Sequence, residues 1–412
     1  MRILIYSYNY YPEPIGIAPL MTELAEGLAK RGHEVRVVAS MPCYPQRRIY
    51  DAYRGKLYST ERRNGVTVQR SYVWVRPQPG LIDRVLLDGS FVATSFLHAL
   101  RGKRPDVIIM TAPPLPVSVP AALLSWMHRC PLILNLQDIL PEAAIHTGLL
   151  TNPVMIRVFE ALEKFAYRAA TRITVLADGF VENLLGKGVN PEKVVLVPNW
   201  VNLKFICPLS KEENAFRKVH KLEGKFVVMY SGNIALTQGL ETVIQAASKL
   251  SNVADIQFAI VGEERALGRL QKHCQTHQAD NVLLLPFQPR SKLPEMLAAA
   301  DVSLVVQKRN VIAFNMPSKI PLLLASGRAV VASVPANGTA AKAVQKSGGG
   351  LVVPPQRPKA LADAILGLYR DPEKTVALGA KGRQYATETF GFNQALDRYE
   401  ALFSELVLKA AK

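Results

Sequence analysis

The sequence predicts an α/β protein made of two doubly wound, Rossmann-like domains, each with a parallel sheet covered by helices on both faces. Three observations predict this. Apolar runs typical of strands alternate with amphipathic runs typical of helices, the alternation pauses at residues 204–225 and then restarts, and 412 residues suit two domains of about 200 residues each. Because ligands of such sheets bind beyond the carboxyl ends of the strands, we expect the site in a cleft across which the two domains face each other.

The first domain is predicted to span residues 1–200. Its expected strands are residues 2–7, 35–39, 66–75, 107–110, 132–136, 173–177 and 194–197. They are continuous apolar runs, which is typical of strands buried on both faces. A helix is predicted at residues 20–31, with Leu20, Leu24 and Leu28 on one face, and another at residues 155–169.

The second domain is predicted to span residues 201–388, and the polar, irregular residues 204–225 are interpreted as the link between the domains. Its expected strands are residues 226–230, 256–261, 282–285, 302–306, 329–332 and 351–353. The helices between them are expected to begin near Leu240, Arg265, Ser291, Ser318, Ala340 and Pro358.

The net charge of +17 favours polyanionic partners. The basic residues are spread along the chain without a basic run or a nucleic-acid motif, so we expect no nucleic-acid partner. Arginine is in excess between Arg47 and Arg84. Two interpretations of that excess stay open: an ordinary solvated surface, or a patch that faces an anionic membrane or a phosphate-bearing acceptor.

Cysteine spacing and hydropathy predict the compartment. The four cysteines lie far apart without a C-x-x-C pair, as expected of reduced thiols in a cytoplasmic protein. We find no secretory signal and no long apolar stretch free of charges or prolines, so we expect a protein that is soluble or peripheral to a membrane. His273, Cys274 and His277 have a spacing that can bind metal, but such triplets are common by chance, and no metal is expected.

Small residues follow several predicted strands just before a helix. A glycine there lets a diphosphate approach backbone amides and a helix N-terminus, which makes these residues candidates for donor binding. The alternative is a turn glycine that needs an unusual backbone angle. The candidates are Gly16 in the first domain and Gly232, Asn233, Gln238, Gly239 and Gly262 in the second.

Cations follow the strand at residues 302–306. Lys308 and Arg309 come directly after it, and Ser318 and Lys319 open the next helix. Positive charge at this edge of a sheet suits a leaving diphosphate, although an exposed basic loop is the alternative. The chain has no D-x-D motif, with which many glycosyltransferases hold a metal on the diphosphate, so cations and helix ends are expected to replace the metal.

A carboxylate is predicted at the same edge of the first sheet. Gln137 and Asp138 follow the strand at residues 132–136, and Glu142 comes shortly after. Asp138 could orient a sugar hydroxyl or act as a base. The alternative is an aspartate that caps a helix.

In this order and spacing, these segments resemble the retaining family-four glycosyltransferases of the GT-B fold over essentially the whole chain, and most closely the colanic-acid type of exopolysaccharide biosynthesis. The segments that carry the resemblance are residues 9–13 with Gly16, 42–46, 137–138, 198–200, 230–234, 238–241, 258–262, 304–309, 317–319 and 325–327.

The resemblance implies a hexose donor of the UDP- or GDP-sugar type on the second domain, with Phe287 near its base, and no cofactor. It implies a lipid-linked saccharide acceptor on the first domain, a cytoplasmic site at the anionic surface of the inner membrane, and a closing helix, residues 389–412, that returns to the first domain. The implied acceptor-side residues are Tyr11, Glu13, Tyr44, Gln137, Asp138 and Glu142, and the implied catalytic residues are Asp138 and Lys319.

The chain departs from the family pattern at three positions. The E-x(7)-E glutamates, which contact the donor, are replaced by Phe314 and Leu322, and a phosphate-binding lysine is replaced by Gln238. These departures shift the expected phosphate contacts to Lys308, Arg309 and Lys319. Two other functions stay open: a sugar-nucleotide epimerase of the same fold, and a non-catalytic subunit that binds nucleotide-sugar.

Overall fold

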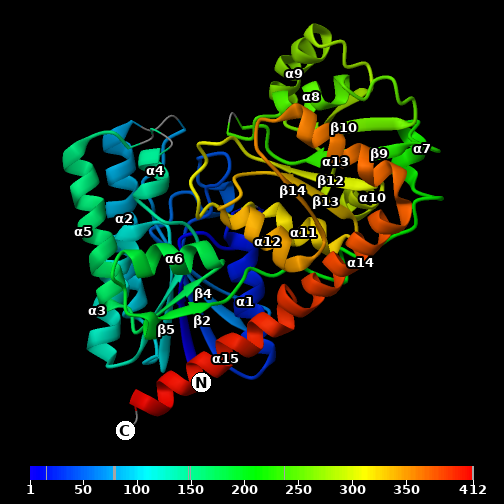
Figure 1. Ribbon diagram of the computed structural model, residues 1–412. Helices are drawn as coiled ribbons and strands as arrows, with labels where there is room; N and C mark the ends of the chain where they lie inside the picture. Colours follow the sequence, from blue (N-terminus) through cyan, green and yellow to red (C-terminus); the bar gives the residue numbers. More distant parts are fainter. Residues whose placement is uncertain (15, 78–79, 147, 149, 236, 411–412) are drawn as a thin grey trace. The chain divides into compact units, whose positions relative to one another are not determined.

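The computed structural model describes residues 1–14, 16–77, 80–146, 148, 150–235 and 237–410. Two compact units divide the chain (Figure 1). One comprises Met1–Asn199 with Ala395–Lys412, and the other comprises Trp200–Gln394. The boundaries between the units therefore lie after Asn199 and after Gln394. The sequence analysis expected the domains to end at residues 200 and 388.

The first unit contains an eight-stranded sheet of order β3-β4-β2-β1-β5-β6-β7-β8. Its strands are β1 (Arg2–Tyr6), β2 (Glu34–Ser40), β3 (Tyr58–Arg63), β4 (Val66–Ser71), β5 (Val107–Ala112), β6 (Leu132–Leu136), β7 (Arg172–Val175) and β8 (Val194–Leu196). All pairings are parallel except that of β3 with β4. The predicted parallel sheet is thus confirmed.

Strand β3 was missed, and the strand predicted at residues 66–75 ends at Ser71. The polar β3 is half-exposed at the edge of the sheet, so it has no apolar run. The signal that could have found it is the Asn64-Gly65 pair, because both residues have positive φ angles, 46° and 83°, as a two-residue hairpin turn requires.

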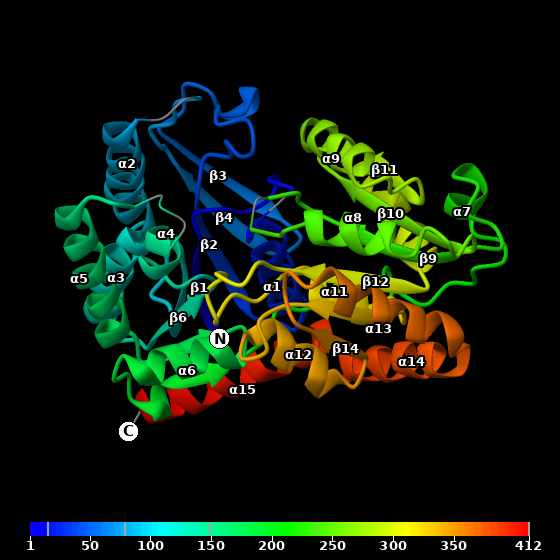
Figure 2. The ribbon, with the colours of Figure 1, turned by 45° about the horizontal axis from the view of Figure 1, so that its top comes forward.

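Helices cover both faces of this sheet. They are α1 (Ala18–Lys30), α2 (Leu81–Ala99), α3 (Ser118–His128), α4 (Glu142–His146), α5 (Pro153–Ala169) and α6 (Asp178–Gly186), with 3-10 turns at Asp51–Tyr53, Leu115–Val117 and Pro191–Lys193. The side chain of Asn152 starts α5 by accepting hydrogen bonds from the backbone of Val154 and Met155. Helix α3 packs against both α2 and α5 (Figures 1 and 2).

The last helix, α15 (Phe392–Ala410), joins the first unit from Ala395 onward, as the resemblance implied. Asn135 Nδ2 donates to the Tyr399 hydroxyl at 3.0 Å inside the core, and Arg172 pairs with Glu405 at 2.8 Å on the surface. These contacts fasten the end of the chain to β6 and β7.

The second unit has a six-stranded parallel sheet of order β11-β10-β9-β12-β13-β14, the strand order of a Rossmann fold. Its strands are β9 (Phe226–Ser231), β10 (Ile256–Gly262), β11 (Val282–Pro286), β12 (Val302–Val306), β13 (Ala329–Ser333) and β14 (Gly350–Val353). Alternate residues of β9 belong to different cores, Val227 and Met229 to one and Val228 and Tyr230 to the other. Because both faces are buried, the strands are apolar throughout.

Six helices of this unit begin within two residues of the expected positions, whereas the helices at Ala215–Val219 and Pro372–Thr389 were not predicted. The helices of this unit are α7 (Ala215–Val219), α8 (Glu241–Ser248), α9 (Glu264–Thr276), α10 (Leu293–Ala298), α11 (Lys319–Ala325), α12 (Thr339–Ser347), α13 (Pro358–Arg370) and α14 (Pro372–Thr389), with a 3-10 turn at Arg290–Lys292.

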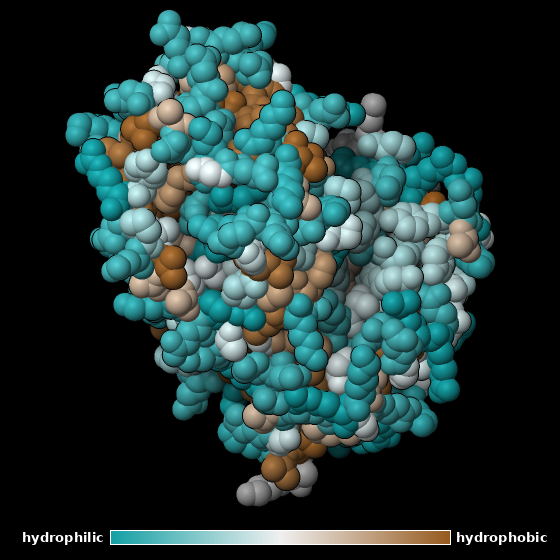
Figure 3. All heavy atoms as spheres, turned by 90° about the vertical axis from the view of Figure 1, so that its right-hand side faces the viewer, coloured by the Kyte–Doolittle hydropathy of each residue, from teal (hydrophilic) through white to brown (hydrophobic). Residues whose placement is uncertain are grey.

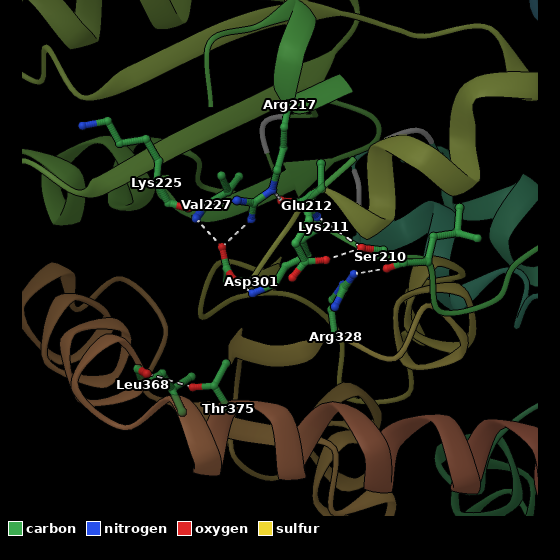
Figure 4. A network of polar contacts seen from close by, with 12 residues as sticks. Ser210, Lys211, Glu212, Arg217, Lys225, Val227, Asp301, Arg328, Leu368 and Thr375 are labelled. Atoms are coloured by element: carbon green, nitrogen blue, oxygen red, sulfur yellow. Dashed lines mark hydrogen bonds and ion pairs between the residues drawn. The ribbon is translucent and has the colours of Figure 1, made fainter. Parts of the chain in front are cut away.

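Residues 204–225, interpreted as a link, are packed into the second unit. Arg217 on α7 pairs with Asp301 at 2.6 Å, and Lys211 pairs with the same carboxylate at 2.5 Å (Figure 4). Asp301 also accepts a hydrogen bond from the backbone of Val227 at 2.8 Å. A buried carboxylate is tolerated only with such partners, so the polar segment belongs to the body of the domain.

The face of the molecule shown in Figure 3 is largely hydrophilic. Hydrophobic side chains gather there in small patches. Among the described helices, none combines the length and the apolar character that crossing a membrane demands.

Candidate functional site

Lys319 is a charged residue of the second unit whose ammonium is buried. It is the first residue of α11, and no described residue accepts a hydrogen bond from the ammonium. The ammonium lies 3.7 Å from the centroid of the Tyr230 ring, a contact that replaces only part of the lost hydration. Burial lowers the pKa of Lys319 to about 7. A buried cation with no anionic partner is suited to an anionic ligand.

The glycine that follows β9 makes room for this ammonium. Gly232 has φ +134°, and a Cβ there would lie 2.8 Å from Lys319 Nζ. The loop is held by the Tyr230 hydroxyl, which donates to the Asn233 carbonyl at 2.6 Å, and by the Gly232 N–H, which donates to Val261 at 3.0 Å. Only glycine combines this backbone angle with such an approach.

Two further candidate glycines pack around the same loop. A Cβ on Gly262 would lie 2.4 Å from Ile234 Cδ1 and 2.9 Å from the Gly232 carbonyl. A Cβ on Gly239, whose φ is +66°, would lie 3.1 Å from Lys308 Cγ. The Lys308 N–H also donates to the Thr237 carbonyl at 2.9 Å. The loops after β9, β10 and β12 therefore meet at one edge of the sheet, as the sequence predicted.

The remaining donor-side candidates lie nearer the surface. Gln238 is half-buried, whereas Asn233, Arg309 and Ser318 are exposed, and Phe287 is 55% exposed just after β11. The Arg309 N–H donates to Gln356 Oε1 at 3.2 Å. Helix α11 has only seven residues and Ser318 makes no capping bond, so the Lys319 ammonium, more than a helix terminus, supplies positive charge here.

The two family glutamate positions carry no carboxylate. Phe314 is 6% exposed, and Leu322 packs against the core of the unit. Their hydrophobic contacts stabilise the segment that precedes and forms α11. Neither position supplies a charged group to this edge of the sheet.

In the first unit, Asp138 follows β6. Its Oδ1 accepts a hydrogen bond from the adjacent Ile139 N–H at 2.9 Å, and no other described group is seen to bond to it. Burial raises the pKa of this carboxyl, and the hydrogen bond opposes the rise. The nearest helix begins only at Glu142, so Asp138 does not cap it. Its carboxylate is available to a substrate.

Two neighbouring acceptor-side candidates have protein partners. Gln137 exchanges hydrogen bonds with Asn199, at 2.7 and 3.2 Å. Glu142 pairs with Lys187 at 3.0 Å and accepts from Asn183 at 2.8 Å. These contacts hold the turn after β6 in place beside Asp138.

Glu13 also has a positioning role. Its buried carboxylate accepts from the backbone N–H groups of Cys43 and Tyr44, both at 2.9 Å, and from Asn9 at 2.7 Å. It thereby ties the turn after β1 to the turn after β2. Tyr44 remains 41% exposed beside this junction.

Tyr11 and Gly16 lie on the loop that precedes α1. Tyr11 is 41% exposed, with the Arg63 guanidinium 3.5 Å from its ring centroid. Gly16 has φ +72° with nothing within 4 Å of a Cβ, which agrees with a turn glycine. The adjacent Ile15 lies outside the described residues.

The arginine excess between Arg47 and Arg84 does not form one surface. Arg70 is fully buried against Glu61, Arg63 pairs with Glu26 at 2.9 Å, and Arg54 pairs with Asp51. Residues 78–79 and the Arg84 side chain lie outside the description. These pairings leave Arg47, Arg48, Arg62 and Arg76 as basic residues of this region for which no ion pair is found in the described part of the chain.

A cavity in the first unit was missed by the sequence analysis. It has a volume of about 500 Å³ and lies where β1, β2 and β6 end. Its lining is Tyr8, Asn9, Cys43, Tyr44, Arg47, Val75, Arg76, Val85, Leu87, Asp88, Leu140, Pro141, Ala144, Leu150, Met155 and Phe159. The available signal was Asp88, a lone acid in the apolar run at residues 85–100. Elsewhere, the described residues contain no group of three His, Cys, Asp or Glu able to hold a metal.

Comparison with known proteins matches both units. A family model described as a glycosyl transferase 4-like domain matches residues 16–200, and one described as glycosyl transferases group 1 matches residues 211–385. WcaI of Escherichia coli K12, a putative colanic acid biosynthesis glycosyl transferase, is 34% identical over 79% of this chain and 82% of its own length. WbjE of Pseudomonas aeruginosa, a probable glycosyltransferase, is 26% identical over 64% of this chain and 66% of its own length.

The fold also matches solved structures. The crystal structure of Anabaena HepE in complex with UDP has a TM-score of 0.72 and 18% sequence identity, and the match covers 98% of this chain and all of that one. Two matching domain models, this fold and a relative that is 34% identical together show that the chain belongs to the family-four glycosyltransferases of the GT-B fold and is related to the colanic-acid type.

Proposed function

We propose that this glycosyltransferase moves a hexose from a UDP- or GDP-sugar to a lipid-linked saccharide acceptor in exopolysaccharide biosynthesis, with retention at the anomeric carbon. The observation that carries the donor part is the buried ammonium of Lys319 beside the Gly232 loop, for which no hydrogen-bond acceptor is found in the described part of the chain. A nucleoside diphosphate supplies the anion that this group lacks. The crystal structures of HepE with UDP and with UDP-glucose support a uridine nucleotide at this type of fold.

The proposed chemistry needs no protein nucleophile. The acceptor hydroxyl attacks the anomeric carbon from the side of the leaving group, the bond to the diphosphate breaks, and the departing phosphate oxygen takes the hydroxyl proton. Lys319, assisted by Lys308 and Arg309, stabilises the charge that develops on the diphosphate. Asp138 orients the acceptor hydroxyl, and positioning supplies the rest of the rate.

No metal or other cofactor takes part in this proposal. The chain lacks a D-x-D motif, and its cations lie at the edge of the second sheet where the diphosphate is proposed to bind. We further propose that the protein works at the cytoplasmic surface of the inner membrane. Support comes from Arg47, Arg48, Arg62 and Arg76, each contributing about 1 kcal/mol near an anionic surface.

The decisive experiment is a thermal-shift screen of UDP, GDP and their hexose conjugates, because a ligand specific for the folded state raises the melting temperature. The stabilising donor is then incubated with a lipid-linked saccharide, and the product is analysed for the new linkage and its anomeric configuration. A new α-linkage from an α-linked donor supports the proposal. Conversion of the nucleotide-sugar without acceptor would point to an epimerase, and binding without turnover to a non-catalytic subunit.

A further inference from the structure

A second cavity of the first unit lies at the amino ends of the strands. It has a volume of about 370 Å³ and is found where β1, β2 and β4 begin, beside the chain that joins α2 to β5. The acceptor-side candidates, such as Asp138, follow the carboxyl ends of the strands instead. This cavity is therefore separate from the site at which the proposed acceptor binds.

Arg36 places a charge on the face of an interior strand. Strand β2 lies between β1 and β4, and Arg36 pairs in register with Thr67 of β4. The side chain is half-buried on the lining of the cavity. Burial lowers the pKa of its guanidinium, and the charge of Glu34 opposes that shift. A charged group that is held in a cavity at a cost in hydration is typical of a binding site.

Hydrogen bonds hold this guanidinium without neutralising it. Its Nη1 donates to Gln69 Oε1 at 2.8 Å and to the Ala99 carbonyl at 2.7 Å. Its Nη2 reaches the Lys103 carbonyl only at 3.4 Å. These three acceptors are uncharged, and no ion pair of Arg36 is found in the described part of the chain. The positive charge therefore remains available to an anion in the cavity.

The turn that passes over Arg36 is fixed to the sheet. Gln69 Nε2 donates to the carbonyls of His98 at 3.1 Å and Arg101 at 2.7 Å. At the next residue, Gly102, a Cβ would lie 2.7 Å from Arg36 Cζ. The φ angle of Gly102 lies outside the left-handed region, so the close approach to the guanidinium, and not the backbone angle, requires glycine here. The wall of the cavity is thus organised around the guanidinium before any ligand binds.

Cations outnumber carboxylates on the lining. Among the described residues it carries four cations and a single carboxylate, namely Arg2, Arg36, Arg101, Lys103 and Glu34. Lys103 pairs with Glu34 at 3.0 Å, and Arg2 pairs with Asp106 at 2.9 Å. The carboxylates of this region are therefore engaged by the two outer cations.

Arg101 is the second cation of the cavity for which the described residues offer no ion pair. Its guanidinium lies 5.3 Å from the centroid of the Tyr58 ring, and the residue is exposed. Arg36 and Arg101 thus present two guanidinium groups without carboxylate partners to one cavity. Planar guanidinium groups suit the oxygens of phosphate.

His98 provides a reporter of charge in the cavity. It is 3% exposed on the lining, and its Nε2 lies 3.2 Å from Thr60 Oγ1. Burial lowers the pKa of His98, a hydrogen bond at the Arg70 backbone opposes the shift, and the charges of Arg101 and Arg36 lower the pKa further. An anion bound between these arginines would favour the protonated imidazole, so its pKa should rise on binding.

We propose that this cavity binds a dianionic phosphate group, with the guanidinium groups of Arg36 and Arg101 on its oxygens. The inference goes beyond the proposed function, because it assigns an anion site apart from the donor site. The volume lies in the range of sites for small organic molecules, and the hydroxyls of Thr60 and Thr67 belong to the lining. A small phosphate ester of a polyol or sugar fits these features. Free phosphate is the other source of the same chemistry.

The test titrates glucose 6-phosphate, inorganic phosphate and glucose calorimetrically into the full chain. Glucose 6-phosphate is expected to bind with a dissociation constant below about 1 mM, and glucose is expected not to bind. An ester site predicts that glucose 6-phosphate binds at least about tenfold more tightly than inorganic phosphate, whereas equal affinity would assign the cavity to free phosphate. NMR of the imidazole should show the pKa of His98 rising with bound glucose 6-phosphate, and His98→Gln identifies its signal.

Two variants and a matched control locate the ligand. Gly102→Ala keeps every charge and displaces the Arg36 guanidinium, and Arg101→Gln removes an exposed charge without disturbing the core. Each should weaken binding of glucose 6-phosphate about tenfold or more, because a charge-assisted contact is lost. Arg104→Gln removes the same charge from the same turn but lies off the lining, so it should leave binding unchanged.

Absence of phosphate binding would overturn the inference, as would unchanged affinity in both Gly102→Ala and Arg101→Gln or an equal loss in Arg104→Gln. Loss of binding in Lys319→Met would place the phosphate at the donor site and equally overturn it. The melting-temperature shift produced by UDP or GDP should persist in Gly102→Ala and Arg101→Gln. Failure of this inference would therefore leave the proposed function standing.

Discussion

The ammonium of Lys319 occupies the space that a side chain on Gly232 would need, since a Cβ there would lie 2.8 Å from Nζ. The two residues are 87 positions apart in the sequence, one directly after β9 and the other at the start of α11. Their contact places a positive charge, for which the described residues offer no acceptor, directly against a glycine loop, and four of the predictions below follow from it.

Lys319→Ala should slow transfer by roughly ten- to a few hundred-fold, because a charge-assisted contact contributes about 1.5–3 kcal/mol and this one strengthens as the diphosphate departs. Donor affinity should fall less than the rate. The measurement is kcat and KM at saturating acceptor, with the melting temperature as control. Wild-type turnover in a folded variant would pass the role to Lys308 and Arg309.

Binding of the nucleotide should weaken as the pH rises above about 7, because Lys319 loses its charge there. The test is to titrate UDP or GDP into the protein between about pH 6 and about pH 9. Because the terminal phosphate of the nucleotide also titrates, with a pKa near 6, the same titration of Lys319→Met serves as the control that isolates the contribution of the lysine. An identical pH profile in both proteins would contradict the assignment.

Stability without ligand should show the opposite trend. The folded pKa of Lys319, about 7, is below its ordinary value of 10.5, so the unfolded chain binds more protons between these values and the free energy of unfolding rises with pH. Below about pH 7 the full cost remains. Lys319→Met should therefore be more stable than wild type, by on the order of a few kcal/mol near pH 6, and the difference should shrink toward pH 10. Urea unfolding at several pH values measures it. A difference that does not change with pH would show that the ammonium is already solvated or paired.

Gly232→Ala should lower donor affinity, since its Cβ would displace the Lys319 ammonium. Gly224→Ala is the control. It also places alanine at a positive φ, +72°, but nothing lies within 4 Å of the new Cβ. Both variants should lose some stability, about 1 kcal/mol or more, and only Gly232→Ala should lose nucleotide binding. Equal loss of nucleotide affinity in the two would mean that backbone strain, and not the lysine, is responsible.

Asp138→Asn should reduce transfer severely and leave the nucleotide dissociation constant nearly unchanged, because Asp138 belongs to the first unit and is assigned to the acceptor. The side chain keeps its size, so the Ile139 hydrogen bond can persist. Single-turnover rates and nucleotide titration give the two quantities. A comparable fall in both would place Asp138 on the donor.

The sequence by itself determined the two parallel sheets, because strands buried on both faces must be apolar throughout, as Val227 to Tyr230 are on β9. It also placed the glycines and cations after the right strands, since parallel strands bring their carboxyl ends to one edge. The half-exposed β3 was not predicted because an edge strand needs no apolar run. The segment at residues 204–225 was interpreted as a link because it is polar, and the sequence does not show that two of its cations pair with the buried Asp301.

Only the tertiary structure decided which charges have partners. Arg70 and Lys319 are both basic residues in the sequence, yet Arg70 is buried against Glu61, whereas the ammonium of Lys319 is buried against an aromatic ring and has no acceptor among the described residues. The cavity beside Asp88 likewise exists only where α2, α4 and α5 converge. Burial and pairing depend on residues distant in the chain, so local sequence patterns identify the candidates and the packing of the fold determines their charge state and their freedom to bind.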